Sequence, residues 1–131
     1  MILLSGCHRQ GDAETRRNLH GRWTLAGDYT DGSHFNSVIT VDPAGAYVCE
    51  IVVQSRWDGV TRTSILGGSL EIRDGMLIDT ITKHSNTNAV LPMISSARIL
   101  RSDDREFVVK YEASDHGSFP TNEIVLRKEE R

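Results

Sequence analysis

Histidine and cysteine, the residue types that most often ligate metals or act as nucleophiles, are few in this chain and lie far apart in the sequence. No two histidines form a His-X-X-X-His pair, and none lies at metal-ligand spacing from a carboxylate. Cys49 lies in an apolar run, which favours a buried small hydrophobe over a nucleophile. The sequence therefore predicts no metal site. The five histidines are His8, His20, His34, His84 and His116.

Sequence motifs typical of catalysis are missing as well. No serine lies in a Gly-X-Ser-X-Gly turn, and no glycine-rich phosphate loop precedes a predicted helix. We therefore expect a protein without enzymatic activity and without a cofactor. A catalytic site assembled from residues that are distant in the sequence is the alternative, which spacing alone does not test.

The length and charge of the chain limit its architecture and its partners. Its 131 residues suit one domain with one core. The net charge is −3, and acidic and basic residues are mixed along the chain, so no basic stripe points to nucleic acid as a partner. The sequence has no run of about 18 apolar residues, the length that a membrane-spanning helix needs.

The second cysteine, Cys7, ends the segment Leu4-Ser5-Gly6-Cys7, which resembles the lipobox of bacterial lipoproteins. In that family small residues precede a cysteine whose thiol is lipidated. The resemblance implies that residues 1–7 are the remnant of a lipoprotein signal from a truncated or misassigned start, because only four residues precede Ser5. It also implies lipidation of Cys7 and anchoring on the periplasmic face of the bacterial envelope, at the outer membrane. The alternative is an inert cysteine at a frayed terminus.

Residues 8–18 are predicted to form a tether and a short helix. The polar segment around Gly11 suits a flexible tether between a lipid and a domain. From Asp12 onward, an Asp at the cap position, an early acid and the later Arg16 and Arg17 follow the charge order that a short helix prefers. We expect the two arginines to be solvated.

After the helix, strand signals recur about every ten residues and alternate with turn residues. Asp58-Gly59 and Asp74-Gly75 indicate hairpins, and Gly67-Gly68 indicates a bulge or a sharp bend. The pattern predicts an all-β fold of eight or nine antiparallel strands. The expected strands cover 21–29, 35–41, 46–57, 60–66 with 69–73 as its continuation or as a further strand, 76–82, 94–100, 106–112 and 122–128.

A continuous meander of short strands favours an up-and-down β-barrel, because a barrel leaves no open edge. A β-sandwich is the alternative. Asp79 and Lys83 interrupt an apolar strand on the face that carries Leu77 and Ile81. Either these two residues point to solvent, or they line a polar cavity.

Gly21-Arg22-Trp23, at the head of this meander and just after the helix, resembles the Gly-X-Trp signature of the lipocalin and calycin group. The chain is similar in particular to small bacterial lipocalin-like domains, over residues 19–129. The alternation of the first strand already predicts that Trp23 points inward. The resemblance further implies that a basic residue of the last strand, Arg127, packs across Trp23 and closes the base of the barrel, a cation–π contact.

The resemblance implies a binding function rather than a reaction. We expect a non-enzymatic envelope lipoprotein whose barrel holds a small apolar or amphipathic ligand. The alternative is a protein-interaction module, such as a periplasmic inhibitor of a protease or lysozyme, or an accessory subunit of the envelope. The sequence assigns neither the ligand nor its binding residues.

Overall fold

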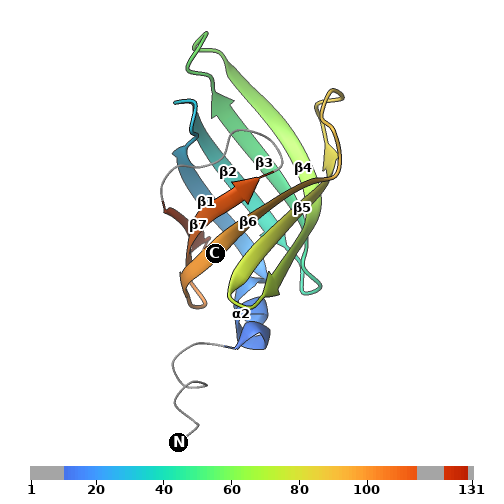
Figure 1. Cartoon of the computed structure of the whole chain (residues 1–131), viewed down its shortest axis with the longest axis vertical. Helices are drawn as coiled ribbons and strands as arrows, with labels where there is room; N and C mark the ends of the chain where they lie inside the picture. Colours follow the sequence, from blue (N-terminus) through green and yellow to red (C-terminus); the bar gives the residue numbers. More distant parts are fainter. Residues whose placement is uncertain (1–10, 115–122, 130–131) are drawn as a thin grey trace, which may run out of the picture.

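In a computed structural model, which describes residues 11–114 and 123–129, the chain forms a closed antiparallel up-and-down β-barrel with a short helix at one end (Figure 1). The predicted barrel is confirmed, with eight strands, and the sandwich is excluded. The elements are α2 (Asp12–Leu19), β1 (Gly21–Asp28), β2 (His34–Val41), β3 (Ala46–Gln54), β4 (Thr61–Arg73), β5 (Met76–His84), β6 (Met93–Ser102), β7 (Glu106–Ser114) and β8 (Ile124–Lys128).

The barrel closes where β8 pairs with β1, with Trp23 opposite Lys128 and Thr24 opposite Arg127. Every other strand pairs with its neighbours in the sequence. The β1–β2, β3–β4 and β5–β6 connections therefore lie at one end of the barrel, which we call the open end. The helix and the β4–β5 hairpin lie at the other, which we call the closed end (Figure 1).

The predicted hairpin at Asp74-Gly75 and the predicted bulge at Gly67-Gly68 are both present. Asp74 and Gly75 have φ angles of 53° and 78°, as a tight hairpin turn requires. Gly67 and Gly68 lie inside one continuous strand, β4, and the register with β5 shifts between them. A Cβ atom on Gly68 would lie 1.9 Å from the carbonyl oxygen of Thr80, so the strands approach too closely for any other residue.

The register shift is a β-bulge that changes which side of β5 faces the barrel interior. Gly67 pairs with Lys83 and Gly68 with Ile81, so Thr82 is the extra residue. Asp79 and Ile81 face inward, Thr82 and Lys83 both lie on the outside, and His84 faces inward again. Of the pair predicted to share a face, Asp79 therefore lines the interior, whereas Lys83 does not.

The predicted helix is present, but its contacts differ from those expected. Gly11, not Asp12, is the N-cap residue. The Asp12 carboxylate instead accepts hydrogen bonds from the backbone N–H groups of Asp74 at 2.9 Å and Gly75 at 3.4 Å. Arg16 and Arg17 are exposed, as expected, and the Arg16 guanidinium also donates to the Ile72 carbonyl at 3.0 Å. These bonds tie the helix to the β4–β5 hairpin and hold it against the closed end.

The core of the closed end is built around Trp23, which is fully buried as predicted. Its ring packs edge-on against Phe107, with centroids 5.2 Å apart, and its indole N–H donates to the Leu19 carbonyl at 2.7 Å. Gly21 has a φ of 137°, in the region that favours glycine. The remaining fully buried large side chains of the described residues are Val41, Ile72, Val109 and Ile124.

A basic residue of the last strand does pack across the tryptophan, but it is Lys128 and not Arg127. The Lys128 ammonium lies 4.9 Å from the centroid of the Trp23 ring and 3.4 Å from the Asn18 carbonyl oxygen. The Arg127 side chain is 69% exposed and lies 3.7 Å from the Glu106 carboxylate. Because directly paired residues share a face, the partner of Trp23 in the register points inward and its neighbour points outward.

Candidate functional site: the barrel cavity

The open half of the barrel encloses a cavity of about 420 Å³. Leu70, Leu77 and Leu126 line it toward the closed end, and Asn86 and Ala89 of the β5–β6 loop line it at the open end. Strand β3 contributes four residues to the cavity, which alternate along the strand and share one face. These four residues are Tyr47, Cys49, Ile51 and Val53.

The carboxyl group of Asp79 is the main polar feature of the cavity wall. It accepts a hydrogen bond of 2.6 Å from the Tyr47 hydroxyl through Oδ1. Burial raises the pKa of Asp79 to about 6, although the bond from Tyr47 acts in the opposite direction. No other described residue donates a hydrogen bond to this side chain, so Oδ2 has no partner within the described part of the chain.

Three tyrosines supply further hydrogen-bonding groups. Burial, the charge of Cys49 and the charge of Asp31 raise the pKa of Tyr29 to about 12. Burial followed by the charge of Asp79 raises the pKa values of Tyr47 and Tyr111. All three phenols are therefore neutral at physiological pH. The Tyr47 hydroxyl donates to Asp79, so Tyr29 and Tyr111 are the ones that offer O–H donors to a ligand.

Cys49 also faces the cavity, with its Sγ 2.9 Å from the hydroxyl oxygen of Ser37. Burial raises the pKa of this thiol, so it is held in the neutral form. A neutral thiol without an adjacent base is a poor nucleophile. Cys49 thus forms part of the wall, in agreement with its interpretation as a small hydrophobe.

The charge of the cavity follows from its lining. Among the described lining residues, the acidic and basic side chains are Asp79 and His84, and none is a lysine or arginine. In the described part of the chain, no group of three or more histidine, cysteine or acidic residues could hold a metal ion.

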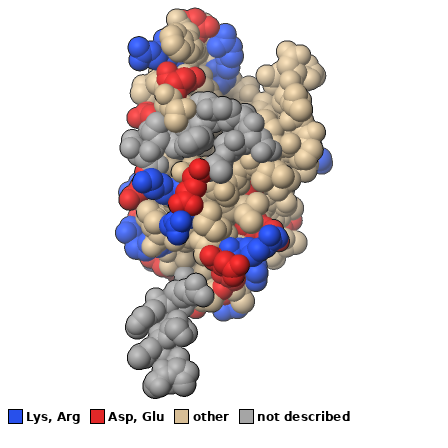
Figure 2. Space-filling model, in the orientation of Figure 1, with Lys and Arg blue, Asp and Glu red and all other residues tan. Residues whose placement is uncertain are grey.

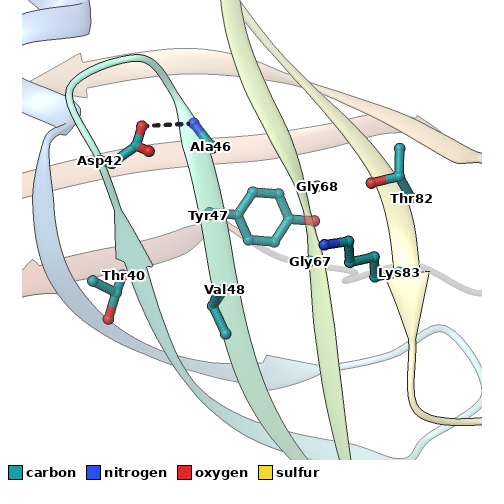
Figure 3. A pocket seen from close by; sticks show the side chains of 9 residues that line it. All are labelled: Thr40, Asp42, Ala46, Tyr47, Val48, Gly67, Gly68, Thr82 and Lys83. Carbon is teal, nitrogen blue, oxygen red and sulfur yellow. Dashed lines mark hydrogen bonds between the residues drawn. The ribbon is translucent and has the colours of Figure 1, made fainter.

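A second depression, of about 500 Å³, lies on the outer surface over β2 to β5 (Figure 3). It forms where Gly67 lacks a side chain in the cross-strand row of Thr40, Val48 and Lys83. Lys83 lies beside this gap (Figure 3). The depression is more open to solvent than the interior cavity. The interior cavity is therefore the better candidate site.

The predicted site residues fall into two groups. Gly21, Trp23 and Arg127 belong to the closed end, remote from the cavity. Cys7, the predicted lipidation site, lies outside the described residues, as do His8 and His116, for which no site was predicted. Sequence reasoning missed the three cavity tyrosines as a polar set, although each lies on a strand face that alternation predicted to carry apolar residues. Acidic and basic groups are interspersed on the face shown in Figure 2, with no basic stripe.

Two known structures with a similar fold are designed β-barrels. A de novo designed fluorescence-activating β-barrel has a TM-score of 0.56 and 17% sequence identity, over 92% of this chain and 100% of the designed one. The redesigned β-barrel mFAP1, bound to DFHBI, has a TM-score of 0.55 and 13% identity, over 88% of this chain and 99% of its own.

Sequence comparison adds no family to this structural similarity. No protein-family profile matches the chain, and no curated protein sequence matches it. Within residues 11–114 and 123–129, no helix is both long and apolar enough to cross a membrane.

Proposed function

We propose that this protein is a non-enzymatic binding domain that holds a small apolar or amphipathic molecule in its barrel cavity. The observation that supports this function is the cavity of about 420 Å³, whose walls are mainly apolar and also carry hydroxyl groups and the carboxyl group of Asp79. Small-molecule sites typically measure about 300 to 1,000 Å³ and have this composition. That the similar barrel mFAP1 is bound to DFHBI adds support by analogy.

The proposal extends to the lipocalin-like family and to the bacterial envelope. Lipidation of Cys7 would anchor the protein to the periplasmic face of the outer membrane. The helix begins at Asp12 at the closed end of the barrel. An anchor five residues before Asp12 would therefore leave the open end and its cavity accessible to ligand.

A second candidate, a protein-interaction module, is favoured by apolar side chains exposed at the open end. Trp57 in the β3–β4 turn is 76% exposed, and Val90 in the β5–β6 loop is 82% exposed. Such residues suit the contact surface of a periplasmic protease or lysozyme inhibitor, or of an accessory envelope subunit. This function would not require the cavity.

The binding function is tested with a neutral fluorescent probe, N-phenyl-1-naphthylamine, titrated into the purified protein. We expect a saturable fluorescence increase with one site. Ser64→Phe places a ring in the cavity, whereas Thr63→Phe places it on the outer face of the same strand. Filling the site should weaken binding by about tenfold or more, and the Thr63 control should leave it unchanged. Absence of saturable binding, or equal effects of both variants, would contradict the proposal.

The anchor is tested by detergent phase partitioning of the protein expressed with its full native start. We expect the wild type in the detergent phase and Cys7→Ser in the aqueous phase. Recovery of the wild type in the aqueous phase would remove the anchor and leave the binding proposal unaffected.

A further inference from the structure

The wall around Asp79 is mostly apolar, which makes an acidic residue there costly. Leu77 and Ile81 flank it on the inward face of β5, and its direct partners are Leu70 on β4 and the buried Ser95 on β6. Taking a carboxylate out of water is unfavourable unless an opposite charge or several hydrogen bonds compensate it. Tyr47 supplies one hydrogen bond, so the folded protein compensates Asp79 only in part.

None of the other titratable groups of the described lining pairs with Asp79 as a cation. They are the phenols of Tyr29 directly after β1, Tyr47 on β3 and Tyr111 on β7, the thiol of Cys49 and, near the mouth, the imidazole of His84. The inward residues that β2, β4, β6 and β8 contribute to the cavity carry no titratable group. The phenols and the thiol are neutral at physiological pH. The described lining therefore contains an acid without a cationic partner.

The nearest lysine in the sequence is kept out of the cavity by the fold itself. Lys83 lies four residues after Asp79, and the bulge at Thr82 places it on the outer surface. The positive charge that could have paired with Asp79 from within the same strand therefore lies on the other side of the sheet.

We propose that the natural ligand is a small organic cation, an amine with an apolar body, whose ammonium group pairs with Asp79. This inference rests on the proposed binding function and specifies its ligand class. The ammonium would donate to Oδ2, and the phenol rings of Tyr47 and Tyr111 can contribute cation–π attraction. The remaining walls would bury the apolar body.

Three probes with the same aromatic body and different head groups test the ligand class. They are 2-(2-naphthyl)ethylamine, which is cationic at pH 7.5, the neutral 2-(2-naphthyl)ethanol and the anionic 2-naphthylacetate. By isothermal titration calorimetry we expect the amine to bind at least about tenfold more tightly than the alcohol, and the carboxylate to bind more weakly than either. Equal affinities of amine and alcohol would overturn the ligand class while leaving the binding function intact.

The role of Asp79 is tested with Asp79→Asn, which keeps the shape of the side chain, and with Asp79→Ser as a second neutral variant. Either folded variant should lose the preference for the amine and retain binding of the alcohol. Glu50→Gln removes one exposed carboxylate from the outer face of β3 and should keep the preference, which separates a local pair from attraction by net charge. A preference that survives in the Asp79 variants would overturn the inference. If no probe binds the wild type, both this inference and the proposed function are contradicted.

Discussion

The two halves of the barrel are built from the same eight strands, yet one is solid and the other hollow. In the closed half, Trp23 and Phe107 meet edge-on under the helix, and no space remains between them. In the open half, the inward residues of the same strands surround about 420 Å³. Leu25, two residues after Trp23, already faces that cavity. The backbone pattern is shared, so side-chain size and the covering helix make the difference.

The closed half of the barrel is built for stability, whereas the open half has the features of a binding site. The closed half buries its large rings completely and satisfies the indole N–H with the Leu19 carbonyl. The open half retains a partly compensated carboxyl group and exposed apolar residues at its rim. We therefore expect substitutions in the closed half to destabilise the fold and substitutions in the open half to change ligand binding with smaller effects on stability.

The largest expected effect is that of Trp23→Ala. Removing this ring should lower the free energy of unfolding by about 3 to 5 kcal/mol, because it leaves a large cavity in a closely packed core. Leu25→Ala on the same strand should cost about 1 to 2 kcal/mol, since its side chain is only partly buried and faces existing space. Urea unfolding followed by fluorescence of the remaining Trp57, or by circular dichroism, measures both. Equal costs would show that the two halves do not differ in packing.

Asp79→Asn is expected to have an intermediate effect of the opposite sign. Burial raises the folded-state pKa of Asp79 from 3.8 to about 6, so the folded state binds more protons than the unfolded state between these pH values. The contribution of Asp79 to stability therefore falls as pH rises from about 4 to about 6. At pH 7.5 the variant should be more stable than the wild type by about 1 to 3 kcal/mol. Its advantage should shrink toward pH 4 in urea unfolding curves measured across this range. An advantage that does not depend on pH would contradict the assignment of a buried, uncompensated carboxylate.

The smallest effect distinguishes two adjacent basic residues at the barrel base. Lys128→Met should lower stability by about 0.5 to 1 kcal/mol, because it removes the cation over the Trp23 ring. Arg127→Met should be nearly neutral, because its side chain is exposed and its ion pair with Glu106 is long. Thermal unfolding of the two variants in parallel makes the comparison. A larger loss for Arg127→Met would reverse the assignment.

The sequence predicted the architecture because strand alternation and turn residues are local signals. Trp23, the Asp74-Gly75 turn and the glycine pair of β4 were all identified from neighbouring residues alone. The role of Arg127 was taken from a family resemblance, and it was wrong by one position because the register between the first and last strands is set by the closure of the barrel. Asp12 was mistaken for a cap because its partners, Asp74 and Gly75, are distant in the sequence.

The cavity was less accessible to sequence reasoning for a related reason. Whether an inward side chain fills space or borders it depends on how residues from all eight strands meet, and no single strand contains that information. From strand alternation alone, Asp79 could point either to solvent or into a cavity, and Lys83 was expected on the same face as Asp79. Only the pairing of β4 with β5 separates them.

The bulge at Thr82 has a consequence for how such barrels could diversify. In a regularly pleated β5, Lys83 would point inward. Its ammonium could then form an ion pair with Asp79, and the pair would have no net charge to attract a cationic ligand. The extra residue Thr82, which lies opposite the Gly67-Gly68 pair of β4, keeps that ammonium on the outer surface. A change of strand register at this point would therefore move a lysine from the outer surface into the wall, and so alter the charge of ligand that the barrel selects.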